Sequence, residues 1–200
     1  METLKAKTAK GLFWGAINSG STQFLNFVIG IFLLRILSVD DYGIVGMIAI
    51  FTLIAGNLQD SGFTTALVNG QDITEEDYNS VFWFSTTISL SLYVILFFSA
   101  PLIADFFHQP CLIPLSRFVF ITFVLSAIGI SHNAFMVRKI MAKERAIISI
   151  VALCLSGIIG ITSALSGLGY WSLAFQQVSY IFITDIGRLY YVRWLPKLHF

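Results

Sequence analysis

Long stretches without a charged side chain are the feature that most constrains how this 200-residue chain folds. Uncharged runs occupy residues 11–34, 42–59, 78–104, 118–137 and 146–184. A helix needs about 20 mostly apolar residues to cross the hydrocarbon core of a bilayer, so each of the first four runs suits one crossing. The fifth run suits two crossings, because Gly167-Leu168-Gly169 marks a tight turn near its middle.

The composition agrees with this interpretation and excludes other classes of protein. Hydrophobic residues make up 56% of the chain and charged residues only 12%, whereas a soluble domain carries about 25% charged residues. The formal net charge of +1 leaves no basic surplus for binding nucleic acid. The sequence contains no metal-ligand, nucleotide-binding or nucleophile motif. We therefore expect no catalytic residue, no metal and no cofactor, and we do not expect an enzyme.

We predict an all-α fold, a polytopic membrane helix bundle that forms a single transmembrane domain over residues 1–200. The six predicted spans are 12–34, 42–68, 79–104, 115–137, 146–166 and 170–191. Two pairs of residues fit a capping box, in which a hydroxyl and an acid three residues later bond to each other's backbone N–H. These pairs are Ser38 with Asp41 and Thr74 with Asp77, and each precedes an apolar run. Pro114 suits the first turn of the fourth span.

The distribution of basic residues predicts the orientation in the membrane. With a cytoplasmic N-terminus, ten of the twelve Lys and Arg residues lie on the cytoplasmic side, and only Arg35 and Arg117 lie outside. An excess of Lys and Arg in cytoplasmic loops is the usual pattern in helical membrane proteins. The basic N-terminus also resembles the start of a signal peptide. We favour a membrane span there, because the apolar run is too long and is not followed by a convincing cleavage site.

Polar side chains inside the predicted spans are candidates for a substrate or ion pathway, because lipid cannot solvate them. In the first span Asn18, Thr22 and Asn26 recur at i, i+4 and i+8, which places them on one face of a helix. Such a face either packs against neighbouring helices through hydrogen bonds or lines a water-filled cavity, and both interpretations are open. The candidate pathway residues are Asn18, Gln23, Asn26, Arg35, Asn57, Asp60, Arg117 and Gln177.

Three charged residues of this set each allow two interpretations. Asp60 is an acid within the second predicted span, which makes it a functional candidate, unless the span ends there and the acid is solvated. Arg35 and Arg117 either snorkel to the outer interface or point inward and bind an anion, because Arg donates two parallel hydrogen bonds to phosphate. Arg35 also lies close in sequence to Asp40 and Asp41, with which it can pair.

The sixth predicted span is unusually polar for a membrane helix. It contains Gln176, Gln177 and Tyr180 in its first half and Asp185 and Arg188 in its second half. The last two residues stand at i and i+3, so we expect them to form an ion pair near the cytoplasmic surface.

Five stretches of the sequence together carry a likeness to a known family. They are Lys10-Gly11-Leu12-Phe13-Trp14; Leu34-Arg35-Ile36-Leu37-Ser38 with Asp41-Tyr42-Gly43; Asp60-Ser61-Gly62-Phe63 with Ala66-Leu67; Thr74-Glu75-Glu76-Asp77-Tyr78; and Gly169-Tyr170-Trp171-Ser172-Leu173 with Gln176-Gln177. As a set they resemble the N-terminal half of a Wzx-type polysaccharide flippase of the MOP superfamily. Val39 departs from the Pro that the family usually carries after the arginine.

This resemblance implies flipping of undecaprenyl-diphosphate-linked oligosaccharide across the bacterial inner membrane, for O-antigen, capsule or exopolysaccharide biosynthesis. Such proteins have two six-helix lobes around a central cation-lined cavity, so this chain corresponds to one lobe. Arg35, Asp60 and Gln177 match family positions. The implied partners are the lipid-linked oligosaccharide, the lipid bilayer and a second lobe, and we expect the chain to be a fragment of a longer protein. The alternatives are a non-transporting membrane scaffold of a polysaccharide assembly complex and a non-functional fragment.

Overall fold

Long helices, connected by short turns, make up nearly all of the computed structural model, which describes residues 4–60, 63–70 and 73–193. Within these ranges the chain forms helices and no strand. The helices are α1 (Leu4–Ile36), α2 (Val39–Asp60), α3 (Phe63–Asn69), α4 (Glu75–Phe107), α5 (Leu112–Arg138), α6 (Ala142–Leu165) and α7 (Trp171–Val192). Each predicted span corresponds to one of the six long helices, and Pro114 lies in the first turn of α5 as expected.

The second predicted span differs from the structure and is corrected here. The sequence predicted one helix over residues 42–68, whereas the structure has α2 up to Asp60 and a separate short helix, α3. The uncharged run itself ends at residue 59, so the charge of Asp60 already marks the point up to which α2 extends.

Both predicted capping boxes are confirmed. The Asp41 carboxylate accepts from the Ser38 N–H at 3.0 Å, and the Ser38 hydroxyl oxygen accepts from the Asp41 N–H at 3.2 Å. The Thr74–Asp77 pair makes the same two bonds, at 2.8 and 3.4 Å. These bonds satisfy backbone donors that a helix start leaves free, which explains why α2 and α4 begin where they do.

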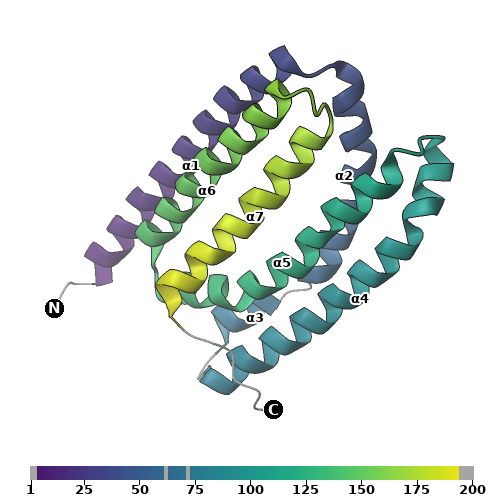
Figure 1. Cartoon of the computed structure of the whole chain (residues 1–200). Helices are drawn as coiled ribbons and strands as arrows, with labels where there is room; N and C mark the ends of the chain where they lie inside the picture. The colour runs from purple at the N-terminus through teal and green to yellow at the C-terminus, as the bar shows by residue number, and fades with distance from the viewer. Residues whose placement is uncertain (1–3, 61–62, 71–72, 194–200) are drawn as a thin grey trace.

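The long helices form two layers (Figure 1). The first layer contains α1, α6 and α7, with α6 packed between the other two. The second layer contains α2, α4 and α5, and the short α3 packs on α5 at one end. The principal contact between the layers is the one between α5 and α7, whereas α2 contacts mainly α5 and α4.

The two layers are held together internally by different side chains. In the first layer glycines allow close approach: a Cβ at Gly157 would overlap Ile29 of α1, and one at Gly160 would lie 3.0 Å from Gln176 of α7. In the second layer large side chains fill the core, which includes Leu112, Leu115, Val119, Phe120 and Phe123 of α5.

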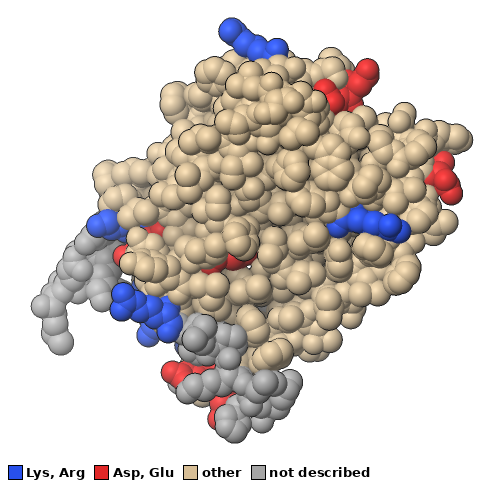
Figure 2. All heavy atoms as spheres, viewed as in Figure 1, with Lys and Arg blue, Asp and Glu red and all other residues tan. Residues whose placement is uncertain are grey.

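Five helices of the described part are long and apolar enough to cross a membrane: α1 from Gly11, α2 to Gln59, α4, α5 and α6. The more polar α7 is not among these five, although its 22 residues match the sixth predicted span. The start of α1 and the end of α7 lie at the same end of the bundle (Figure 1). Uncharged atoms cover most of the face shown in Figure 2, and its charged side chains gather mainly toward the ends and one edge. The chain is therefore an all-α polytopic membrane bundle.

Candidate functional site

A polar cavity of about 500 Å³ lies between α2 of the second layer and all three helices of the first layer. Each of the four helices contributes at least one side chain that can hydrogen bond. The polar lining residues are Asn26 of α1, Tyr42 of α2, Ser156 of α6, and Gln176, Gln177 and Tyr180 of α7. The rest of the lining is apolar or small: Val45, Gly46, Ala49, Leu153 and Leu173. No charged side chain belongs to this described lining.

Helix periodicity brings these residues to one place. On α7, Leu173, Gln176, Gln177 and Tyr180 recur at i, i+3, i+4 and i+7, which is the spacing of a single helix face. The lining residues of α2, from Tyr42 to Ala49, follow the same spacing. Because Gly46 and Ala49 are small, this face of α2 leaves space open toward α7.

Close packing fixes part of the cavity wall. Gln176 lies directly against Gly160, so a side chain at position 160 would displace it. Ser156 is fully buried and its hydroxyl donates to the Leu153 carbonyl oxygen at 3.2 Å. Tyr42 and Tyr180 pack against the apolar cluster around Ile29, Leu33 and Leu153, which restricts both rings. These side chains are therefore positioned before any ligand binds.

A smaller cavity of about 320 Å³ continues along the same side of α2. It shares Val45, Ala49 and Gln177 with the first cavity and adds lining from Ile48, Thr52, Leu53 and Val119. The Thr52 hydroxyl donates to the Ile48 carbonyl oxygen at 3.0 Å and is thus satisfied within its own helix. Gln177 stands between the two spaces, so it is the most central polar residue of the site.

The structure brings together two of the predicted pathway residues, Asn26 and Gln177, in the wall of the larger cavity. Gln23 is exposed on α1. The Oδ1 atom of Asn18 is buried and has no hydrogen-bond partner. The polar face of α1 is therefore divided, since one residue lines the cavity and the others do not.

The remaining predicted residues lie elsewhere. Arg35 is exposed in the last turn of α1, and Asp41 bonds to Ser38 rather than to Arg35. Asn57 is exposed on α2 and outside the cavity lining. Asp60 ends α2, and its side chain lies outside the described part of the structure.

Arg117 has local partners on the neighbouring helix. Its guanidinium carbon lies 4.2 Å from the centre of the Phe97 ring, and its Nε–H donates to the Phe97 carbonyl oxygen at 3.4 Å. A cation over an aromatic face is a stabilising arrangement. Arg117 therefore joins α5 to α4 and does not line the cavity.

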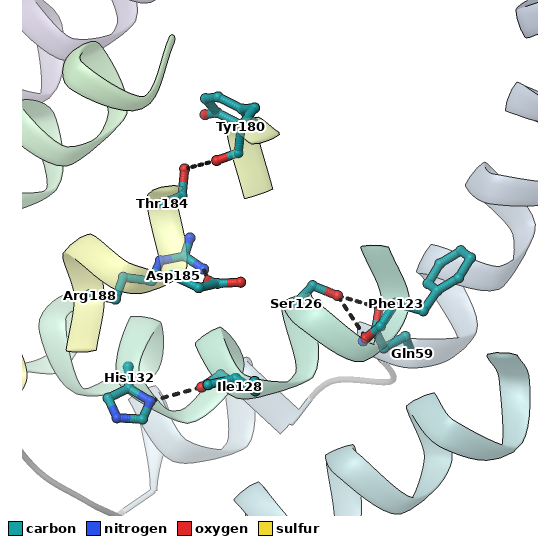
Figure 3. A network of polar contacts seen from close by, with 9 residues as sticks. All are labelled: Gln59, Phe123, Ser126, Ile128, His132, Tyr180, Thr184, Asp185 and Arg188. Carbon is teal, nitrogen blue, oxygen red and sulfur yellow. Dashed lines mark hydrogen bonds and ion pairs between the residues drawn. The ribbon is translucent and has the colours of Figure 1, made fainter. Parts of the chain in front are cut away.

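Sequence reasoning missed Gln59 of α2, a buried amide with three hydrogen bonds to neighbouring helices (Figure 3). This buried amide donates to the Ser89 hydroxyl and to the Phe123 carbonyl oxygen, both at 2.7 Å. Its Oε1 accepts from the Ser126 hydroxyl at 3.1 Å. Gln59 thus joins α2 to α4 and α5. Only its position beside Asn57 and Asp60 in a polar part of the span hinted at this role.

The predicted Asp185–Arg188 pair is confirmed, with an N–O distance of 2.9 Å (Figure 3). Asp185 is buried against Gly129 of α5, where a Cβ would overlap its carboxylate. His132 is fully buried, and its Nδ1–H donates to the Ile128 carbonyl oxygen at 2.8 Å. The Asp185–Arg188 pair lies at the contact between α5 and α7, and this contact requires glycine at position 129.

A second unpredicted contact holds α3 in place. The Nη1 atom of Arg138, at the end of α5, donates to the carbonyl oxygens of Leu67 at 3.0 Å and of Gly70 at 2.8 Å. These carbonyls lie at the end of α3, where a helix leaves acceptors unsatisfied. Arg138 therefore connects the segment after α2 to the centre of the second layer.

These features define the class of protein: a polytopic α-helical membrane protein with a neutral, hydrogen-bonding cavity between its two helix layers. A family model described as polysaccharide biosynthesis protein matches residues 32–200. The chain belongs to this family of polysaccharide biosynthesis proteins.

The chain is similar in sequence to proteins from several bacteria. The chain is 30% identical to the succinoglycan biosynthesis transport protein ExoT of Rhizobium meliloti (strain 1021), over 94% of this chain and 37% of the relative. It is 24% identical to the lipopolysaccharide biosynthesis protein WzxC of Escherichia coli (strain K12), over 99% of this chain and 41% of the relative. It is 25% identical to the teichuronic acid biosynthesis protein TuaB of Bacillus subtilis (strain 168), over 70% of this chain and 29% of the relative.

The chain spans about two fifths of the length of the first two relatives named above. One of these relatives is named as a transport protein. No solved structure matches the chain.

Proposed function

We propose that the chain is the N-terminal lobe of a flippase for undecaprenyl-diphosphate-linked oligosaccharide in the bacterial inner membrane. The lobe acts in the biosynthesis of a cell-surface polysaccharide such as O-antigen, capsule or exopolysaccharide. The observation that carries the proposal is an open cavity with six polar lining side chains between α7 and three helices that are apolar enough to cross a membrane. Membership of a polysaccharide biosynthesis family supports it.

The chain works together with a second lobe. Transporters built from repeats move one repeat against another around a shared binding site. The outer helices α1 and α2 are the least buried of the five apolar helices, with 11% of the most apolar window buried in each. These two helices offer the surface on which a second lobe packs, and the length of the relatives leaves room for one.

We place the N-terminus in the cytoplasm. This orientation puts Arg138, Lys139, Lys143 and Arg188 on the cytoplasmic side, in agreement with the positive-inside pattern. The starts and ends of successive long helices alternate between the two ends of the bundle, which is consistent with such a distribution (Figure 1).

The pathway residues divide into distinct roles. Asn26 and Gln177 line the cavity and contact the substrate, whereas exposed Arg35 attracts the diphosphate at the outer end of α1. Asp60 binds a coupling proton or cation. Gln23 and Asn57, which are exposed, extend the polar surface of α1 and α2 toward the second lobe. Asn18 adds a buried amide oxygen to the polar face of α1. Arg117 contributes through its contact with Phe97 rather than through the substrate.

A leaflet-translocation assay on the complete protein tests the transport function. Reconstituted protein moves a fluorescent lipid-linked oligosaccharide between leaflets, and we expect Arg35→Ala and Asp60→Asn to slow this movement. Asp105→Asn, at an exposed residue of α4, is the matched control and keeps the wild-type rate. Wild-type rates in both test variants would remove the roles assigned to Arg35 and Asp60, and a complete protein that moves no lipid would remove the function.

Accessibility of cysteines distinguishes this function from the scaffold alternative. Asn26→Cys and Asn57→Cys react with a water-soluble maleimide if their helices border water, and they are protected if their polar faces only join helices. We expect reaction at position 26, because Asn26 lines the cavity.

A further inference from the structure

The cavity between the layers is chemically neutral although the proposed substrate carries a diphosphate. Its six polar side chains are three amides, two phenols and one hydroxyl: Asn26, Gln176, Gln177, Tyr42, Tyr180 and Ser156. Strong phosphate binding in proteins uses Arg, Lys or clustered backbone N–H groups at a helix start. The described lining offers no cation, so this cavity is poorly suited to a phosphate group.

The diphosphate-binding residue proposed above lies outside the cavity. Arg35 is nine residues after Asn26 on the same helix, which corresponds to about 14 Å along the helix axis. A ligand that reaches both residues therefore presents two chemically different parts. The part near Arg35 is anionic, and the part in the cavity is neutral.

The amides match groups that both donate and accept hydrogen bonds. An Asn or Gln side chain has two N–H donors and one acceptor oxygen, and a sugar hydroxyl likewise donates and accepts. Asn26 is exposed, and Gln176 and Gln177 are only partly buried, so none is sealed away from a ligand. The three amides come from α1 and α7 and face one space, which permits several simultaneous hydrogen bonds to one ring.

The two tyrosines supply the apolar contact that a sugar ring also needs. A pyranose carries C–H groups on its faces, and an aromatic ring has a negative face that attracts them. Tyr42 and Tyr180 come from different layers and are held by the same apolar cluster. A volume of about 500 Å³ lies within the range of small-ligand pockets, about 300–1,000 Å³.

We propose that this cavity binds neutral sugar residues of the oligosaccharide through Asn26, Gln176 and Gln177, with Tyr42 and Tyr180 packing on the sugar rings. The assignment rests on the proposed function and adds that, within this lobe, the glycan and not the diphosphate occupies the cavity.

Protection of an engineered cysteine from labelling tests the proposal. Cys111 and Cys154 are first replaced by serine, and Gln177→Cys is introduced into the full chain in a phosphocholine detergent, which has no sugar headgroup. The probes are the neutral disaccharides maltose and lactose, compared with glucose 1-phosphate. At a disaccharide concentration ten times its dissociation constant, labelling by a maleimide slows by about a factor of ten. Glucose 1-phosphate protects at least several-fold less.

Two further variants keep the test decisive. Ala49→Cys is a second reporter at an exposed lining residue that is not one of the proposed sugar-binding side chains. Asn57→Cys lies on α2 outside the lining, so sugar leaves its labelling rate unchanged. Failure of both disaccharides to protect either reporter, equal protection by glucose 1-phosphate, or unreactive reporters without sugar would each overturn the proposal. If the complete protein flips lipid without such protection, only the sugar site is wrong; if protection occurs without flipping, only the transport function is wrong.

Discussion

The two layers of the bundle use opposite means of holding membrane helices together. In the layer of α1, α6 and α7, helices approach closely because Gly157, Gly160 and Gly187 have no side chain between them and their neighbours. In the layer of α2, α4 and α5, bulky side chains fill the core, and a buried amide, Gln59, ties the peripheral helix α2 to the others. Lipid provides little hydrophobic drive for helix association, so close packing and buried hydrogen bonds are the two available sources of specificity. The polar cavity lies where the two kinds of layer meet.

Gly157→Leu has the largest expected effect, because it blocks the approach of α1 to α6. The new side chain meets Ile29, which lies where its Cβ would be. Overpacking of this kind costs about 1–3 kcal/mol. Denaturant unfolding in detergent, followed by circular dichroism, measures the loss. Gly20→Leu is the control, since nothing lies within 4 Å of a Cβ there; equal losses in both variants would contradict the assigned packing.

Gln59→Leu is the corresponding test of the second layer. It removes bonds to Ser89 and Phe123 and leaves the Ser126 hydroxyl with only its own-helix acceptor, the Phe123 carbonyl oxygen. We expect the free energy of unfolding to fall by about 1–2 kcal/mol, which is the upper part of the range for hydrogen bonds between membrane helices. The same unfolding measurement applies, with exposed Asn57→Leu as the control. If Gln59→Leu is as stable as wild type, the amide does not hold α2.

Combining the two substitutions tests whether the two layers contribute independently to the free energy of unfolding. Gly157 and Gln59 lie in different layers and share no partner, so their effects on the free energy of unfolding add within about 0.5 kcal/mol. The double variant Gly157→Leu/Gln59→Leu measures this. A coupling larger than about 1 kcal/mol would mean that the layers do not behave as separate units.

Arg138→Ala has a smaller and more local effect. It removes two hydrogen bonds to the carbonyls at the end of α3, which together contribute about 1 kcal/mol because Arg138 is partly exposed. Faster amide hydrogen exchange in α3, with little change in α6 and α7, is the expected result. Lys139→Ala is the control at the next residue, which is exposed, and general acceleration across the chain would argue against a local role.

Asp41→Ala has the smallest expected effect of the series. It breaks the capping box at the start of α2, which costs about 0.5–1 kcal/mol. Asp77→Ala breaks the equivalent box of α4 and should cost about the same. Thermal unfolding of both variants beside Asp105→Ala checks this, and losses indistinguishable from that control would show that the caps contribute nothing.

Much of the helix layout could be predicted from the sequence because its causes are local. Gaps between charges located the six long helices, and the capping pairs Ser38–Asp41 and Thr74–Asp77 marked two helix starts, although the predicted spans began later, at 42 and 79. The predicted span 42–68 was too long, although the charge of Asp60 had left open the interpretation that the span ends there. Local chemistry therefore indicated the starts of these helices more reliably than the end of α2.

The candidate site was predictable only in part, because its formation depends on tertiary contacts. Periodicity marked Asn26 and Gln177 as polar within apolar helices, and both line the cavity. Periodicity gave no reason to include Tyr42 among the lining residues. It also gave no reason to exclude Arg117 from the candidate site, because its partner Phe97 lies on another helix. The role of Gln59 could not be predicted either, because only the packing of α2, α4 and α5 shows which groups its amide contacts.

The contact between α5 and α7 has a mechanical consequence. It is the principal joint between the layers, with Phe118 against Trp171 and Phe175 toward one end and Gly129 against Asp185 toward the other. Because α2 packs mainly on α5 and α4, this joint sets how far α2 stands from α7 and therefore the size of the cavity between them.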